Sequence, residues 1–79
     1  MNDAQAPEVV VTKHAAKRGK KRLRLSPSAV EKIASRALRD GHWLTEKLVL
    51  YGQYRVAFAF RPDGTAVVTS IWAYHGNDL

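Results

Sequence analysis

Residues 54–74 read YRVAFAFRPDGTAVVTSIWAY, and this stretch decides the fold. Two runs rich in β-branched and aromatic residues, 54–61 and 65–74, are typical of β-strands. Between them lies Pro-Asp-Gly at 62–64, a sequence that favours a tight hairpin turn. The stretch therefore predicts two antiparallel strands joined by a short loop.

The neighbouring segments extend this hairpin. Residues 44–51 form a third strand-like run, and Gly52-Gln53 gives a turn signal between it and the hairpin. Residues 9–12 are β-branched and predict either a short strand or an extended lead-in. The sheet is thus expected to have three antiparallel strands, or four if residues 9–12 join it.

The alternation along residues 54–61 predicts two different sheet faces. One face carries Tyr54, Val56, Phe58 and Phe60, and the other carries Arg55, Ala57, Ala59 and Arg61. The Pro-Asp-Gly connection favours a three-residue loop that pairs Arg61 with Thr65. It would place Thr65, Val67, Thr69, Ile71, Ala73 and His75 on the arginine face, and Ala66, Val68, Ser70, Trp72 and Tyr74 on the aromatic face. A two-residue loop would exchange these two sets, so the register of this strand stays open.

Two helices are expected before the sheet. Ser26 and Pro27 give an N-cap followed by proline at the first helical position, and Gly41 ends the helix. Its apolar stripe comprises Val30, Ile33, Ala34, Ala37 and Leu38. Residues 13–22 predict an earlier helix, which Gly19 weakens by roughly 1 kcal/mol. The aromatic face of the sheet needs a cover, and the second helix provides it.

The predicted architecture is a single α+β domain. Two N-terminal helices pack on one face of a three-stranded antiparallel sheet, with a four-stranded sheet as the alternative. Residues 1–8 are expected to be a flexible tail, and residues 9–79 to form the domain. The chain has 79 residues, which leaves no room for a second core.

Residues 13–24 carry the charge. Seven of these twelve residues are Lys or Arg, none is acidic, and the formal net charge of the whole chain is +6. Such a density of cations favours an anionic partner, most commonly nucleic acid. The alternative is a solvated basic arm without a partner. The expected partner-binding residues are Lys13, Lys17, Arg18, Lys20, Lys21, Arg22, Arg24, Arg55 and Arg61.

Several function classes are disfavoured by composition. The chain has no cysteine, so disulfides and thiolate chemistry are excluded, in keeping with a cytoplasmic location. No apolar run is long enough to cross a bilayer, no secretory signal is recognisable, and no membrane partner is expected. No metal-ligand spacing, paired carboxylates or Gly-rich phosphate loop occurs, so we expect no metal, no cofactor and no small-molecule ligand.

A histidine leads the basic segment. His14, Arg18 and Arg22 fall at i, i+4 and i+8, so on a helix they share one stripe. A histidine beside phosphate-binding arginines suits acid–base chemistry on a nucleic acid. The alternative is an ordinary surface histidine.

The segment Thr12-Lys13-His14-Ala15-Ala16-Lys17-Arg18, followed by Arg22 and by the helix that ends at Gly41, resembles a known pattern. His-Ala-x-x-Arg-x-x-x-Arg, a second helix and an antiparallel sheet are typical of RelE- and BrnT-type toxins of toxin–antitoxin systems. The resemblance implies an mRNA endoribonuclease that acts free or on the ribosome, and a cognate antitoxin. It assigns catalysis to His14 by motif, and to Arg61 and Tyr74 by residue type.

The chain departs from that pattern in two places. It carries an extra basic pair between the motif and the second helix, and it ends soon after the last strand, where many relatives place a catalytic residue. A non-catalytic inhibitor of the anti-CRISPR type, encoded by a phage or mobile element, is therefore the alternative prediction. It would bind an acidic surface of a host protein complex and block its nucleic-acid binding. A plain nucleic-acid-binding accessory protein is the third interpretation.

Overall fold

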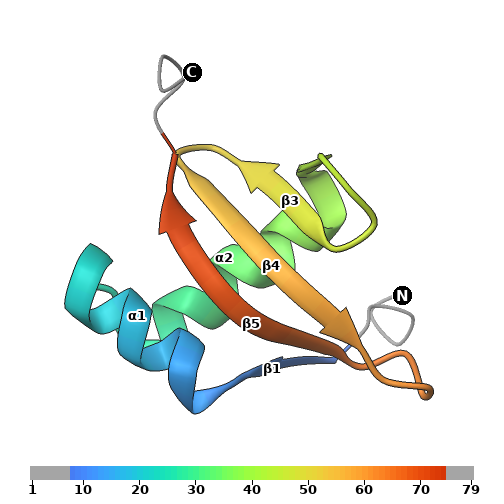
Figure 1. Cartoon of the computed structure of the whole chain (residues 1–79), viewed down its shortest axis with the longest axis horizontal. Helices are drawn as coiled ribbons and strands as arrows, with labels where there is room; N and C mark the ends of the chain where they lie inside the picture. The colour runs from blue at the N-terminus through green and yellow to red at the C-terminus, as the bar shows by residue number, and fades with distance from the viewer. Residues whose placement is uncertain (1–7, 75–79) are drawn as a thin grey trace.

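Five strands form one mixed sheet in the order β1-β5-β4-β3-β2 (Figure 1). The computed structural model describes residues 8–74. The strands are β1 (Val9–Val11), β2 (His42–Trp43), β3 (Leu48–Tyr51), β4 (Tyr54–Phe60) and β5 (Ala66–Ala73). The helices are α1 (Lys13–Leu23) and α2 (Pro27–Asp40), both lying between β1 and β2 in the chain. The predicted α+β class is confirmed.

The sheet is larger than the sequence indicated. We expected three or four antiparallel strands, whereas β1 pairs in parallel with β5, and β2 pairs with β3 at the opposite edge. The short strand that residues 9–12 offered is present as β1, but its parallel pairing with β5 was not expected. Strand β2 has two residues, which carry too little alternation to be recognised from sequence.

Helix α2 crosses the sheet on one face and forms the core with it (Figure 1). The Ser26 hydroxyl accepts a hydrogen bond of 3.1 Å from the Ala29 N–H, as expected of an N-cap. The buried side chains of α2 are Val30, Ala34 and Ala37, three members of the predicted stripe. Across from them lie the buried side chains of Val49, Val56, Phe58, Val68 and Ile71.

Helix α1 lies beside β5 and against α2. The Thr12 hydroxyl caps its first turn by accepting from the Ala15 N–H, and the Thr12 N–H bonds to the Val68 carbonyl at 3.2 Å. Gly19 is buried, and a Cβ there would lie 2.6 Å from a methyl carbon of Val30. Gly19 is therefore a close-contact position between the helices, besides being the weak helix former that the sequence indicated.

The predicted faces of the strand at residues 65–74 are correct only for its first half. The Arg61 N–H bonds to the Thr65 carbonyl at 3.0 Å, which confirms the three-residue loop. A β-bulge then shifts the register, so that Phe58 faces Val68 while Ala57 faces Ser70. Beyond the bulge the two faces exchange. Ile71 pairs with Val56 and is buried in the core, whereas Trp72 pairs with Arg55 on the opposite face.

Two expectations fall outside the described residues. The predicted flexible tail at residues 1–8 does so except for Glu8, and so does the placement of His75. Within residues 8–74, neither α1 nor α2 has the length and apolar character needed to cross a membrane.

Candidate nucleic-acid interface

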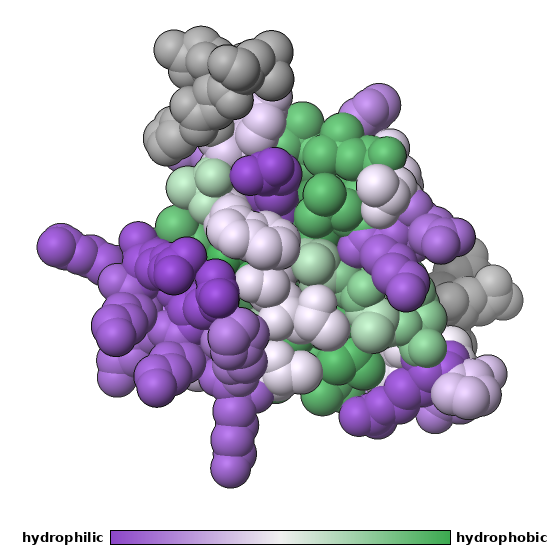
Figure 2. Space-filling model, in the orientation of Figure 1, coloured by the Kyte–Doolittle hydropathy of each residue, from purple (hydrophilic) through white to green (hydrophobic). Residues whose placement is uncertain are grey.

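Among residues 8–74, no helix lies over the sheet face opposite α2, and we call this face the open face (Figures 1 and 2). The register assigns to it Leu48, Leu50, Arg55, Ala57, Ala59, Val67, Thr69, Ser70 and Trp72. Figure 2 shows that its middle is apolar to weakly polar, with strongly polar side chains gathered beside it where α1 lies. The sequence placed Arg55 and Arg61 on this face between small residues; in the structure the face is mainly apolar, and cations flank it.

One arginine stands within this face, between two aromatic rings. The guanidinium carbon of Arg55 lies 5.8 Å from the ring centroid of Trp72 and 5.8 Å from that of Tyr74. Both distances are within the range of a cation–π interaction. The Arg55 Nε is buried and has no hydrogen-bond partner among residues 8–74. Cation–π contacts of this kind are electrostatic and use no conventional hydrogen bond, so the guanidinium N–H donors remain for another acceptor.

A second polar group of this face also lacks a partner. Ser70 is 8% exposed, and its Oγ has no hydrogen-bond partner in the described part of the chain. Ser70 shares the bulge with Thr69, whose hydroxyl donates to the Ala57 carbonyl at 3.3 Å. Buried hydroxyls in folded proteins are normally hydrogen-bonded, so the Ser70 hydroxyl is an exception to explain.

Cations line the flank of the open face. We call this set the basic cluster: Lys13, Lys17, Arg18, Lys20, Lys21, Arg22 and Arg24. All but the half-buried Arg18 are exposed. Across residues 8–74 the one ion pair joins Arg39 to Asp40 at 3.8 Å, so no member of the basic cluster is neutralised by a described carboxylate.

Helix electrostatics account for only part of the basic cluster. Lys20, Lys21 and Arg22 lie in the last turn of α1, where cations complement the helix dipole. Lys13 lies at the first position of α1, where a cation opposes the dipole and no acid of the first turn compensates it. Helix stability alone therefore does not explain the charge at both ends of α1.

At the corner between the two helices the basic surface is hollowed. The depression is lined by Lys20, Arg24, Leu25, Ser26 and Pro27. Arg24 caps α1 in the left-handed conformation, with φ 57° and ψ 37°, a position at which glycine is usual. The left-handed backbone conformation therefore does not explain why residue 24 is an arginine. Its positive charge, however, matches that of the other residues of the basic cluster.

His14 and Arg18 contact one another as the sequence spacing indicated. The Nε of Arg18 donates to the Nε2 of His14 at 2.8 Å, which requires an imidazole whose Nε2 carries no proton. Arg22 lies one further turn along α1 and is exposed. The predicted stripe of His14, Arg18 and Arg22 is thus assembled on one helix.

The three expected catalytic residues, by contrast, lie apart. Thr12, two residues before His14, is bonded to Val68 in the middle of β5. Arg61 pairs with Thr65 before the start of β5, and the Tyr74 N–H bonds to the Gln53 carbonyl beyond its end. At about 3.3 Å per residue, Arg61 and Tyr74 are roughly 25–30 Å apart. The structure does not bring His14, Arg61 and Tyr74 into one site.

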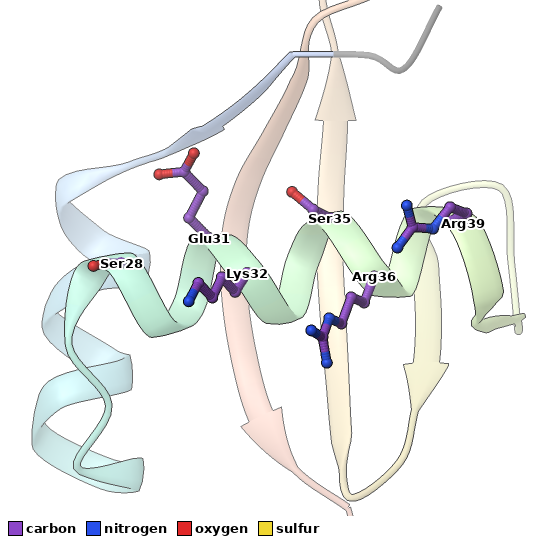
Figure 3. Close-up of a pocket in the computed structure, with 6 residues that line it drawn as sticks. All are labelled: Ser28, Glu31, Lys32, Ser35, Arg36 and Arg39. Carbon is purple, nitrogen blue, oxygen red and sulfur yellow. The ribbon is translucent and has the colours of Figure 1, made fainter. Parts of the chain in front are cut away.

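A second group of cations lies on the far side of the molecule. The outer face of α2 carries Lys32, Arg36 and Arg39 along a shallow depression that Glu31, Ser28 and Ser35 also line (Figure 3). All six residues are exposed and belong to the face of α2 opposite its apolar stripe. Within residues 8–74, no three His, Asp or Glu side chains are arranged to hold a metal ion.

Trp72 is the open-face residue that sequence reasoning missed. Strict alternation assigned it to the core, but the bulge turns it to the open face beside Arg55. The signal was present in Val68-Thr69-Ser70-Ile71, where two polar residues separate two large apolar ones and so interrupt the period of two.

Comparison with known proteins does not extend this description. No family model matches the chain, and neither the curated proteins nor the solved structures contain a match.

Proposed function

We propose that this protein is a nucleic-acid-binding domain of the small toxin type, with RNA as the first ligand to test. The single observation that carries the proposal is the basic cluster, which has seven cations without a described carboxylate partner. A surface of this kind attracts the phosphates of a nucleic acid and releases their counterions on binding. The RelE-like resemblance supports RNA rather than DNA, through the assembled stripe of His14, Arg18 and Arg22.

Binding is proposed ahead of cleavage. Acid–base catalysis needs its groups within hydrogen-bond reach of one reacting position. The separation of His14, Arg61 and Tyr74 does not provide this, whereas phosphate binding requires only exposed cations on one surface.

The test measures the affinity for a fluorescent single-stranded RNA at several salt concentrations. We expect log Kd to rise with log salt, by about 0.7 for each phosphate contact. The triple variant Lys20→Gln, Lys21→Gln, Arg22→Gln should lower this slope by roughly 2 and weaken binding more than tenfold at 100 mM salt.

A matched control separates this effect from net charge. The triple variant Lys32→Gln, Arg36→Gln, Arg39→Gln removes the same charge from the outer face of α2, on the other side of the sheet. We expect it to change the affinity less than threefold. Equal losses for the two triple variants, or no binding by the wild type, would contradict the proposal.

The same samples test cleavage. The RNA is incubated with the wild type and with His14→Ala and Arg61→Ala variants, and the products are separated by size. Products that disappear with either substitution would establish endoribonuclease activity. Intact RNA, or identical products from all three proteins, corresponds to binding alone.

A second candidate function has its own observation. Trp43, Leu44 and Phe60 are 41%, 44% and 46% exposed, and Trp43 lies 6.3 Å from Phe60 between ring centroids. Exposed apolar groups of this size favour a protein partner. The non-catalytic inhibitor of the anti-CRISPR type would use them beside an acidic surface of a host complex. A partner that is retained after nuclease treatment, and lost with Trp43→Ser, would support this function.

A further inference from the structure

We propose that the open face binds the bases of a single-stranded nucleic acid, by stacking at Trp72 and Tyr74 and by hydrogen bonds from Arg55. This inference rests on the proposed function, because the basic cluster would hold the phosphates of the same strand. It adds a second surface with a different chemistry, and it specifies that the strand is unpaired.

The composition of β3 indicates that the open face is covered by a ligand. Leu48 and Leu50 lie on the open face, whereas Val49 between them is fully buried in the core. An apolar run without alternation is typical of strands that are covered on both faces. Within residues 8–74 only one face of β3 contacts a helix.

The polar groups of the face indicate what kind of ligand covers it. The Ser70 hydroxyl is more than nine-tenths buried and has no partner in the described chain, and neither has the Arg55 Nε. A purely aliphatic ligand would offer no acceptor to the Arg55 guanidinium. A nucleobase offers a flat apolar face for the rings of Trp72 and Tyr74, together with in-plane acceptors for Arg55.

Charge distinguishes a nucleic acid from a second copy of the chain. Two copies that met through the open face would each bring the basic cluster toward the contact, and each carries a formal net charge of +6. Like charges beside an interface oppose association. A single strand supplies anionic phosphates to the basic cluster and bases to the open face, so both surfaces contribute to the same complex.

A duplex fits this arrangement less well. The bases of a duplex are stacked on each other, so their flat faces are not available to protein rings. The open face should therefore discriminate against duplexes, whereas the basic cluster alone should bind both forms.

The chain provides a matched pair of reporters for this proposal. It has two tryptophans, of which Trp72 lies on the open face. Trp43 pairs with Val49 on the other face and lies 6.2 Å from Phe58 between ring centroids. The Trp43→Phe variant leaves Trp72 as the emitting residue, and the Trp72→Phe variant leaves Trp43.

The experiment titrates each reporter with a ten-nucleotide oligouridylate, the corresponding oligothymidylate, an abasic strand of equal length and a duplex. We expect the oligouridylate to quench Trp72 and to leave Trp43 unchanged. Quenching by the oligothymidylate as well assigns recognition to bases and phosphates, and a response to RNA alone adds the 2′-hydroxyl. The abasic strand and the duplex should bind through the basic cluster without quenching Trp72.

Affinity gives a second measurement. We expect Trp72→Ala to weaken oligouridylate binding at least about fivefold, since a stacked base contributes on the order of 1–3 kcal/mol. The affinity for the abasic strand should stay within twofold, which also shows that the variant is folded. Arg55→Gln should act in the same direction. Arg61→Gln, one residue beyond the far end of β4, should have a smaller effect.

The outcomes separate this inference from the proposed function. Salt-dependent binding without quenching of Trp72, or equal affinities for the abasic and base-containing strands, would overturn the inference and leave the proposed function standing. No binding of any strand would overturn both. A ligand-free dimer in sedimentation that blue-shifts Trp72 emission would show that the open face binds a second copy instead.

Discussion

The two helices are both amphipathic and both cationic, yet packing within the fold accounts for the sequence of only one of them. Helix α2 buries three side chains under the sheet and mixes Glu31 and Asp40 with its cations. Helix α1 buries only Ala15 and Gly19, carries no acid, and presents most of its length to solvent. Packing thus determines the sequence of α2, whereas the cations of α1 form no ion pair with a carboxylate in the described part of the chain.

The contrast predicts opposite responses to substitution in the two helices. Val30→Ala removes a fully buried side chain of α2 and leaves a cavity, so the free energy of unfolding should fall by about 2–3 kcal/mol. Arg22→Ala on the exposed face of α1 should change it by less than about 0.5 kcal/mol. Urea unfolding of both variants measures the difference. A loss of several kcal/mol for Arg22→Ala would show that the fold itself requires the charge of α1.

The contact between the helices gives the next largest effect. In Gly19→Ala, the new Cβ would lie 2.6 Å from a methyl of Val30, a stiff and fully buried neighbour. We expect a net loss of about 1–2 kcal/mol from this clash, although alanine favours the helix by about 1 kcal/mol. The measurement is again the free energy of unfolding in urea.

A double variant isolates the cause of that loss. In the Val30→Ala background the clashing methyl is absent, so Gly19→Ala should there be neutral or stabilising. An equal loss in both backgrounds would place the strain elsewhere in α1.

A similar contrast, between local and long-range interactions, explains which features of the fold could be predicted from the sequence. Helix α2 was predicted with its cap, its apolar stripe and its end, because local propensity and burial agree along the whole element. The hairpin loop was predicted for the same reason, since the Pro-Asp-Gly sequence sets the Arg61–Thr65 pairing. These features depend on residues that are close in the chain.

The rest depends on residues that are distant in the chain. The parallel pairing of β1 with β5 joins segments from opposite ends of the domain, such as Val9 with Ala66, and depends on where α1 and α2 carry the chain. The bulge at Thr69 exchanges the faces of β5, and this change of one residue moved Trp72 from the expected core to the open face. The basic cluster was predicted as a charged segment, but its position beside that face required the fold.

Arg24 allows the charge of α1 to be tested separately from its structure. Its φ of 57° is strained for arginine and unstrained for glycine, so Arg24→Gly should raise the free energy of unfolding by up to about 1 kcal/mol. Because the variant also removes a cation of the basic cluster, it should weaken RNA binding severalfold. Unfolding and binding measured on one preparation test both effects. A more stable protein with unchanged affinity would exclude Arg24 from the interface.

Acid unfolding gives the smallest expected effect. It tests whether the Asp63 carboxylate stabilises the fold, in contrast to the cations of α1. The hydrogen bond of 2.9 Å from the Thr65 N–H to the Asp63 carboxylate lowers the pKa of Asp63. A carboxyl group whose pKa is lower in the folded state stabilises the fold at neutral pH. That stabilisation is lost as the pH falls below about 4 and through the lowered pKa.

Asp63→Asn provides the matching measurement, because asparagine keeps an acceptor at the same position without the charge. The wild type should have a slightly higher urea midpoint than Asp63→Asn at pH 6, and the two midpoints should converge as the pH approaches 2. Asp63 is exposed, so the difference should be small and should shrink in salt. A gap that persists at pH 2 would mean that the hydrogen-bond geometry, rather than the carboxylate charge, stabilises the turn between β4 and β5.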